Sequence, residues 1–429
     1  MQQRHTKTFN ISSFTGFKQQ MLNWANQFDI CCFFDDNNYH QKFGSYDCLL
    51  AAGAVDTFAP QQNILARLKH FNALNDDWLF GHFSYDLKNE VEQLYSGGMD
   101  NIGFSPVFLF RPGIVISIKG TEAAISSLTE SPAAVFEEII QLPVNGGHYS
   151  SQKVNIQNRI NRDTYIRTIK RLQEHILRGD CYEINFCQEF FAEDAVIEPI
   201  ETYRDLSAVS PSPFSCYYKL NDKYLLCASP ERYIKKTGNK IISQPMKGTA
   251  TRDLKDDAID NQLKVSLLNS AKDKSENVMV VDLVRNDLSK ICTEGSVQAE
   301  ELFAVQSFPQ VHQMVSTISG TLKYGLGIAE ILEATFPMGS MTGAPKKRVM
   351  ELIEQYEPVK RGIFSGAVGY ITPAKDFDFN VVIRSIMYNA QTQYLNYLAG
   401  SGITFYSDPE KEYEECLLKA SAIQKVLNG

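Results

Sequence analysis

The amino-acid sequence predicts a mixed α/β (α+β) protein. Its 429 residues are 44% hydrophobic and 21% charged, which is the balance of an ordinary globular chain. Runs of β-branched and aromatic residues are interspersed with stretches whose apolar residues recur at helical spacing, as in proteins that pack helices on sheets. No run approaches the roughly 18 consecutive apolar residues that a membrane helix needs. The net charge of −8 argues against a nucleic-acid-binding protein, whose surface would carry a basic stripe.

The first third of the chain is predicted to be rich in strands. Residues 30–34 and 106–118 are the clearest strand candidates, because they are dominated by β-branched and aromatic residues. Residues 64–71 have the spacing of a short helix. We therefore expect this part to form a sheet with few helices.

A polar, glycine-containing stretch at residues 142–152 is the best candidate for a domain boundary. We expect an N-terminal companion domain over residues 1–150 and a larger domain over residues 151–429. The larger domain opens with a helix that Thr164 caps and Gly179 ends, and its apolar residues share one face.

Further strands and helices are predicted along the larger domain. The strand candidates are residues 181–191, 223–227, 233–236 and 240–243. Pro345 is expected at the first position of a helix, where its missing N–H costs nothing. The last helix begins at Asp408 and Pro409. Its inward face is formed by Cys416, Leu417, Ala420, Ile423 and Leu427.

The cysteines indicate a reducing compartment. Nine cysteines are scattered without a Cys-x-x-Cys pair, which fits free thiols better than a disulfide framework or a zinc site. No apolar segment of the signal-peptide type follows the N-terminus. We therefore expect a cytoplasmic protein.

Lys247 is the most suggestive single residue. A strand-like run leads through Pro245 to Lys247 and then to Gly248, which would let a ligand approach the backbone. Such a lysine can be a nucleophile if desolvation or a nearby cation lowers its pKa. The simpler alternative is a surface lysine in a β-turn.

Two groups of carboxylates are candidate metal ligands. Glu276 lies in a helical segment at residues 272–287 that interleaves charged residues with an apolar core, and there Asp282 is expected to pair with Arg285. The last helix carries Glu412, which borders its apolar face, and Glu415, which points away from it. Mg²⁺ prefers one or two carboxylates completed by water and substrate oxygens. The alternative for the glutamates of the last helix is that they only interact favourably with the helix dipole, since acidic residues are common in the first turn of a helix.

Two glycine-rich segments are candidate anion sites. Residues 339–346 lack the spacing of a phosphate-binding loop but lead a turn onto a helix N-terminus. Residues 398–403 are predicted to form a glycine-bracketed turn that presents N–H groups to a carboxylate.

These segments together resemble, in order, the motifs of the chorismate-utilising enzymes over about residues 150–429. The matching motifs are residues 229–232 (Ser-Pro-Glu-Arg), 245–249 (Pro-Met-Lys-Gly-Thr), 276–287, 339–346, 365–370, 383–384 and 399–402. Residues 81–87 resemble the family's companion domain more weakly. The resemblance implies an anthranilate-synthase-like fold, in which two near-orthogonal β-sheets form a sandwich flanked by helices.

Two positions distinguish the branches of the family. Isochorismate and salicylate synthases carry a water-activating lysine where this chain has Glu183, and anthranilate synthases carry alanine where it has Lys247. The resemblance is therefore greatest to the aminodeoxychorismate synthase branch, with anthranilate synthase as the alternative. A catalytically inactive chorismate-binding subunit is a third possibility, against which the presence of Lys247 argues.

The resemblance implies a role for each matching residue. Lys247 would attack ring carbon 2 of chorismate and form a covalent adduct, while Glu231 would protonate the departing 4-hydroxyl. Mg²⁺ would be held by Glu276 and Glu415. Gln313 stands where the family often has a catalytic histidine. The residues expected to bind substrate are Gly248, Thr249, Lys346, Tyr370, Arg384, Gly400 and Gly402.

The resemblance also implies partners. The chain has no amidotransferase domain, so ammonia would come from a glutamine amidotransferase small subunit or from free ammonium. A separate lyase would be needed to reach 4-aminobenzoate. The family's tryptophan-type pocket is expected in the N-terminal part, although residues 49–52 (Leu-Leu-Ala-Ala) depart from its usual signature.

Overall fold

The computed structural model confirms the mixture of helices and strands, and it describes residues 3–39, 42–144, 153–309 and 311–428. The elements before residue 145 are β1 (His5–Asn10), α1 (Phe14–Ala25), β2 (Ile30–Asp35), β3 (Cys48–Phe58), α2 (Ile64–Leu74), β4 (Leu79–Phe83), η1 (Tyr85–Leu87), α3 (Lys88–Val91), β5 (Val107–Lys119), β6 (Glu122–Ser127) and α4 (Pro132–Gln141).

The elements after residue 152 begin with β7 (Gln157–Asn158), α5 (Arg162–Leu177), β8 (Glu183–Ala192), α6 (Pro199–Val209), β9 (Phe214–Leu220), β10 (Lys223–Ser229), β11 (Arg232–Thr237), β12 (Lys240–Gln244) and β13 (Met246–Thr251). They continue with α7 (Asp257–Asn269), α8 (Ala271–Ile291), β14 (Gln298–Ser307), β15 (Val311–Thr321), α9 (Ile328–Thr335), η2 (Gly339–Met341), β16 (Gly343–Ala344) and α10 (Lys346–Tyr356). The last are β17 (Ala367–Ile371), β18 (Phe377–Val381), β19 (Ser385–Asn389), β20 (Tyr394–Ile403) and α11 (Pro409–Asn428).

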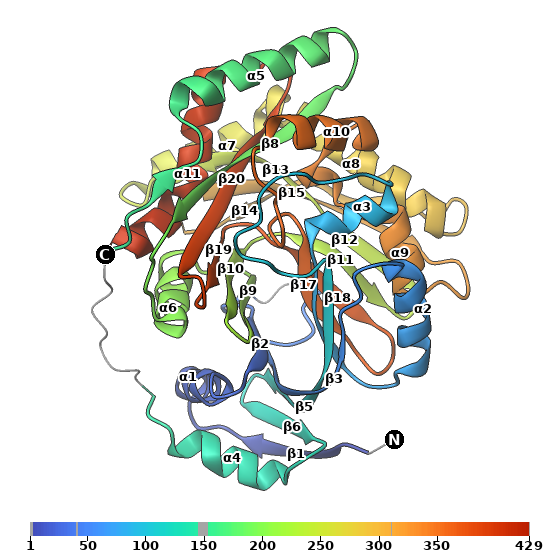
Figure 1. Ribbon diagram of the computed structural model, residues 1–429, viewed down its shortest axis with the longest axis vertical. Coiled ribbons are helices and arrows are strands. Elements are labelled where there is room, and N and C mark those ends of the chain that lie inside the picture. The colour runs from blue at the N-terminus through green and yellow to red at the C-terminus, as the bar shows by residue number, and fades with distance from the viewer. Residues whose placement is uncertain (1–2, 40–41, 145–152, 310, 429) are drawn as a thin grey trace.

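The strands form one antiparallel ladder that divides at β5. One side of β5 pairs with β3, whereas its other side pairs first with β4 and then with β6. A first arm continues from β3 through β2, β9, β10, β19 and β20 to β8. A second arm continues from β4 through β17, β18, β11 and β12 to β15, which also pairs with β13 and β14. Figure 1 shows helices flanking these strands.

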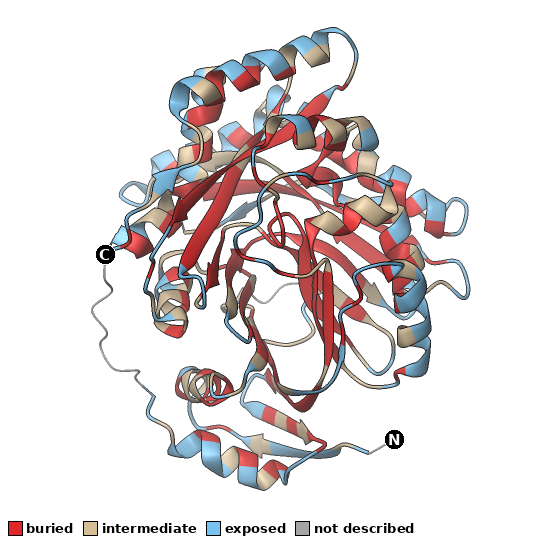
Figure 2. Cartoon of the chain, viewed as in Figure 1, coloured by how far each residue is buried: buried red, intermediate tan, exposed pale blue. Residues whose placement is uncertain are grey.

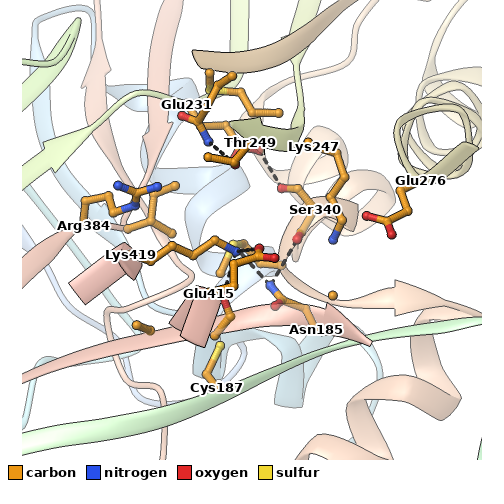
Figure 3. A pocket seen from close by; sticks show the side chains of 18 of the residues that line it. Asn185, Cys187, Glu231, Lys247, Thr249, Glu276, Ser340, Arg384, Glu415 and Lys419 are labelled. Carbon is orange, nitrogen blue, oxygen red and sulfur yellow. Dashed lines mark hydrogen bonds and ion pairs between the residues drawn. The ribbon is translucent and has the colours of Figure 1, made fainter. Parts of the chain in front are cut away.

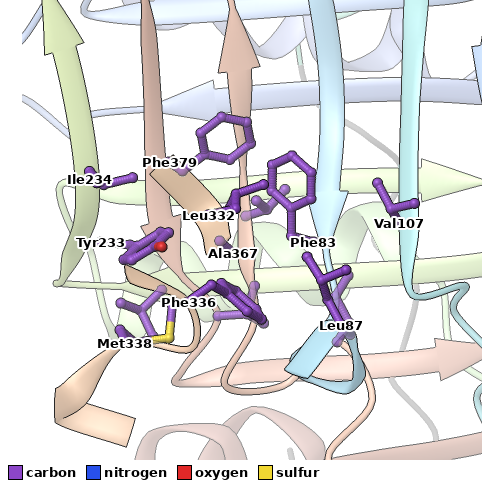
Figure 4. Close-up of a cluster of buried hydrophobic side chains, with 14 of the residues drawn as sticks. Phe83, Leu87, Val107, Tyr233, Ile234, Leu332, Phe336, Met338, Ala367 and Phe379 are labelled. Atoms are coloured by element: carbon purple, nitrogen blue, oxygen red, sulfur yellow. The ribbon is translucent and has the colours of Figure 1, made fainter. Parts of the chain in front are cut away.

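Strand alternation creates two large hydrophobic cores. In β2, Cys32 belongs to a core that joins both arms with α8 and α9, whereas Cys31 and Phe33 face a second core. The second core packs the outer face of the first arm against α1, α4, α5, α6, α10 and α11. In Figure 2 the strands are mostly buried and the exposed residues gather on the helices. Part of the first core, including Phe83, Tyr233 and Phe379, is drawn in Figure 4.

The predicted boundary between residues 150 and 151 lies outside the described residues. Strands from both sides of it share the ladder, because β2 pairs with β9 and β4 pairs with β17. The proposed division into two domains stays a prediction.

Three local predictions differ from the structure. Asn161, not Thr164, caps α5, because its side chain accepts a hydrogen bond from the Thr164 N–H at 2.9 Å. Pro345 is the N-cap of α10, one residue before the first helical residue Lys346, and not the first helical residue as predicted. Residues 398–403 belong to strand β20 and not to a turn, since they pair with β8 over their whole length.

The remaining expectations concern the cysteines, the surface ion pair and membrane helices. All nine cysteines are buried and free. Asp282 does pair with Arg285, at 3.0 Å, but on the exposed side of α8. Within the described ranges, we find no helix that combines the length and the apolar character required to span a bilayer.

Candidate active site

A pocket opens between β8, β13, β20, α8 and α11 and encloses about 950 Å³, part of it open to solvent (Figure 3). It brings together most of the predicted site residues: Glu231, Lys247, Gly248, Thr249, Glu276, Arg384, Gly400, Gly402 and Glu415. Glu412 and Gln313 also line it. Residues from seven separate segments of the sequence thus meet at one place.

Tyr370 does not line this pocket. Its ring packs against Phe34, Trp78 and Phe80 at centroid distances of 5.8–5.9 Å. It lines a separate cavity with Arg232, whose guanidinium is bound to Asp378. The structure therefore separates Tyr370 from the other residues expected to contact the substrate.

Lys346 is also absent from the pocket lining. Its ammonium donates to Asp287 Oδ2 at 2.6 Å and to the Thr335 carbonyl at 3.1 Å. Burial lowers the pKa of Lys346, although Asp287 opposes the change. Lys346 thus ties the start of α10 to α8 and α9, where the sequence had predicted a substrate contact.

A bulge in β13 directs Lys247 into the pocket. The register with β15 shifts by one residue between Met246 and Thr249, and Gly248 takes a φ of +92° there. Lys247 therefore lies in a strand and not in the predicted turn. Figure 3 shows its side chain extending into the pocket between Ser340 and Glu276.

Lys247 forms a buried ion pair with Glu183, and the Nζ–Oε1 distance is 2.5 Å. Only 13% of the lysine side chain and 3% of the glutamate side chain are exposed. Burial alone would lower the pKa of Lys247, but Glu183 and Glu276 outweigh it, so the pKa lies above its ordinary value. The lowered pKa that would favour a nucleophilic lysine is therefore not found here, because the charged neighbours of the amine are carboxylates and not cations.

Glu231 has the surroundings of a general acid. It follows β10, where its N–H donates to Ser229 Oγ at 3.2 Å, and its carboxylate accepts from Ser340 Oγ at 2.6 Å. Burial raises the pKa of the Glu231 carboxyl to about 7, although Ser340 and Lys247 oppose the rise. A carboxyl with this pKa holds its proton to neutral pH and can donate it to a leaving group.

The carboxylates on α8 and α11 fit the chemistry of a divalent cation. Burial raises the pKa of Glu276 to about 7, so its charge is poorly compensated. Lys419 lies 2.8 Å from Glu415 and holds the pKa of that carboxyl below its ordinary value. Glu412 is buried and lines the same pocket, so geometry leaves both residues of α11 available as ligands.

A metal here would need ligands beyond the protein. Among the residues that the structure describes, no group of three or more His, Cys, Asp or Glu side chains is placed to hold a metal ion. Mg²⁺ is usually bound by one or two protein carboxylates, and water and substrate oxygens complete its coordination. The two carboxylates found here match that pattern.

Arg384 supplies positive charge on the other side of the pocket in Figure 3. Its backbone has a φ of +53°, a strained value for a residue other than glycine. Burial lowers the pKa of Arg384 to about 10, and Glu415 only partly opposes this. A buried guanidinium in a pocket is suited to bind a carboxylate.

The sequence reasoning missed several residues of the pocket. Asn185 donates to the Ser340 carbonyl at 3.2 Å, and Lys419 donates to the Gly400 carbonyl at 2.9 Å. Both Ser340 and Lys419 could have been predicted from the sequence. Ser340 lies in the motif at residues 339–346, and Lys419 is one helical turn after Glu415, on the same face of the last helix.

Gln313 and His312 face opposite ways from β15. Gln313 lines the pocket and its amide lies 3.5 Å from Thr249 Oγ1. His312 is buried against Asp260, with Nε2 3.1 Å from Oδ1. The histidine next to Gln313 therefore does not replace the family histidine in the pocket.

A family model described as chorismate binding enzyme matches residues 29–425. The chain therefore belongs to the chorismate binding enzymes. Among its relatives, aminodeoxychorismate synthase component 1 of Escherichia coli (strain K12) is 39% identical over 271 residues, which are 63% of this chain. The match spans 59% of that protein's length.

Other relatives are named anthranilate synthases. Anthranilate synthase component 1 of Thermus thermophilus is 30% identical over 357 residues, covering 81% of this chain and 76% of that protein. The solved anthranilate synthase component I from Streptococcus pneumoniae superposes with a TM-score of 0.77 at 24% identity, covering 90% of this chain and 94% of that one. The predicted anthranilate-synthase-like fold and the family resemblance are confirmed.

Proposed function

We propose that this chain converts chorismate and ammonia to 4-amino-4-deoxychorismate through a covalent lysine intermediate. The observation that carries the proposal is that the Lys247 amine and the Glu231 carboxyl, whose pKa lies at about 7, line one pocket. The name of the Escherichia coli relative supports the same reaction.

Each residue then has a defined task. Arg384 binds a substrate carboxylate, and the outer edge of β20 near Gly400 and Gly402 forms the adjacent wall. Lys247 attacks ring carbon 2 as Glu231 protonates the 4-hydroxyl, which leaves as water. Ammonia then attacks carbon 4 and expels the lysine. Two displacements replace one difficult substitution.

We propose Mg²⁺ as the cofactor. Glu276 and either Glu415 or Glu412 would hold the ion, which would neutralise a carboxylate of the substrate when bound. The burial of Glu276, which Lys272 and Lys247 offset only in part, supports this assignment, because a cation would offset the rest of its cost.

Ammonia is proposed to come from a glutamine amidotransferase subunit. The name "component 1" of the Escherichia coli relative supports a division of the reaction between chains. The cytoplasm is the proposed compartment, since nine free, buried thiols suit reducing conditions.

Anthranilate synthesis is the second candidate, favoured by the name of the Thermus relative. It would place nitrogen at carbon 2, the position that Lys247 reaches in our proposal. A single experiment separates the two. Purified protein is incubated with chorismate, Mg²⁺ and ammonium, and the product is identified by mass spectrometry. We expect 4-amino-4-deoxychorismate without pyruvate, whereas anthranilate and pyruvate would contradict the proposal.

A further inference from the structure

We propose that Glu183 is the base that takes a proton from Lys247 before the amine attacks the substrate, and that returns it when the amine is expelled. The inference rests on the proposed function, in which Lys247 is the nucleophile. It answers a difficulty that the site presents, since an ammonium ion has no lone pair with which to attack.

The contact between the two side chains is direct. Glu183 Oε1 lies 2.5 Å from Lys247 Nζ, so the proton has no water to cross. Gly402 makes this approach possible, because a Cβ at that position would overlap both Nζ and Oε1. Position 402 therefore leaves space for the pair.

The Glu183 carboxylate has few hydrogen-bond partners besides Lys247 among the described residues. Its second oxygen, Oε2, is buried and receives no hydrogen bond from the described residues. With 3% of its side chain exposed, Glu183 also lacks stabilisation by bulk water.

The other charged groups around Lys247 are worse placed to accept its proton. Glu276 on α8 and Glu415 on α11 act on the amine through their charge, but neither lies within ion-pair distance of it. Glu231, with its pKa of about 7, is the acid that we propose protonates the leaving hydroxyl. Glu183 on β8 is the carboxylate in contact with Nζ.

The proposed cycle balances. The N–H bond of the Lys247 ammonium breaks and an O–H bond forms on Glu183, leaving a neutral amine. The amine bonds to carbon 2 as the carbon–oxygen bond at carbon 4 breaks, and the hydroxyl leaves with the proton of Glu231. Ammonia bonds to carbon 4, and the lysine departs as a neutral amine. Glu183 then returns its proton to Lys247, while the new ammonium group on the product reprotonates Glu231.

The first test measures the amine without the reaction. Lys247 is labelled competitively with acetic anhydride between pH 6 and 11, and its labelling is quantified by peptide mass spectrometry against the exposed Lys255. In Glu183→Gln we expect the pKa that the labelling profile gives for Lys247 to fall by at least about one unit, because the carboxylate that stabilises the ammonium at equilibrium is gone. Glu189→Gln is the matched control, since Glu189 is a buried carboxylate of the same strand paired with Arg159, and should change labelling less than twofold. Unchanged labelling in Glu183→Gln would overturn the pairing on which the proposal depends.

The second test measures adduct formation from chorismate without ammonia. At pH 7, we expect Glu183→Gln to form the adduct about 10²-fold more slowly, because its amine must lose a proton to solvent. The ratio of variant to wild-type rate cancels the contribution of Glu231 and should rise about tenfold per pH unit. A ratio that is flat in pH would show that Glu183 only positions the lysine, and would overturn the base role alone. Absence of the adduct from both proteins would overturn the proposed function and the base role together.

Discussion

Two buried ion pairs flank strand β8, and they differ in how completely their hydrogen bonds are satisfied. Arg361 donates to both oxygens of Glu357 and to the carbonyls of Met341 and Asn185. Glu357 also accepts the N–H of Cys187 at 2.9 Å.

The Lys247–Glu183 pair has one short contact, and Glu183 Oε2 receives no hydrogen bond from the part of the chain that the structure describes. The Arg361–Glu357 pair fixes backbone groups of β8 and η2, whereas the Lys247–Glu183 pair is the one in which we propose that a proton moves. A buried ion pair is therefore evidence for chemistry only when part of its hydrogen-bonding capacity is left open.

Removing the lysine of the unsatisfied pair should have the largest effect. Lys247→Ala is expected to lose at least about 10³-fold in kcat/KM for ammonia-dependent amination, because the covalent route disappears. Product formation measured by mass spectrometry checks this, with Lys255→Ala, an exposed lysine, as the control. Amination that survives at the wild-type rate would rule out the nucleophile.

Breaking the satisfied pair should change stability before chemistry. Arg361→Leu leaves the Glu357 charge buried, and we expect the free energy of unfolding to fall by about 3–5 kcal/mol. Urea denaturation measures it. Arg285→Leu, which removes the exposed pair with Asp282, should cost less than about 0.5 kcal/mol. Equal losses in the two variants would contradict the comparison.

Glu231 should show opposite effects on activity and stability. Its pKa of about 7 exceeds the ordinary 4.5, so the unfolded chain releases the proton first and the fold loses stability as pH rises from 4.5 to 7. Glu231→Gln should abolish most amination yet raise the free energy of unfolding by up to about 3 kcal/mol at pH 8 and by less than about 1 kcal/mol at pH 5. Denaturation at both pH values checks the sign, and a variant less stable at pH 8 would refute it.

The same pKa predicts how activity depends on pH. Because Glu231 acts as an acid, wild-type kcat/KM should decline as pH rises above about 7, approaching a tenfold loss per pH unit. Steady-state rates from pH 6 to 9 with saturating ammonia measure this limb. A rate that climbs across that range would exclude Glu231 as the proton donor.

The smallest effect is expected at the metal ligands. Glu276→Gln should weaken Mg²⁺ binding by about tenfold or more, measured by calorimetry and by the Mg²⁺ dependence of amination. Glu414→Gln, which changes an exposed carboxylate of α11, should leave the affinity unchanged. Equal Mg²⁺ affinity in both variants would remove Glu276 from the ligand set.

Much of this site could be predicted because its residues lie in short ordered motifs. Lys247, Glu231 and Glu276 were predicted by motif and line the pocket as expected. Lys346 also lies in such a motif, but its ammonium donates a hydrogen bond to Asp287 instead of lining the pocket. The direction of a side chain depends on packing that a short motif does not encode.

The partnership of Lys247 and Glu183 could not be predicted from sequence. The two residues lie on different strands, and their contact depends on the bulge at Gly248 and on the missing side chain at Gly402. The turn predicted at residues 398–403 failed for a related reason. Glycines there serve close approach between β20, β8 and β13 rather than reversal of the chain.

The central claim is tested most directly by the mass of the working enzyme. Protein incubated with chorismate and Mg²⁺ in the absence of ammonia is quenched in acid, weighed intact, and digested for peptide mapping. The account predicts a species heavier by one chorismate less one water, with the modification on Lys247 and its disappearance on addition of ammonium. An unmodified chain under conditions in which product forms would contradict the account.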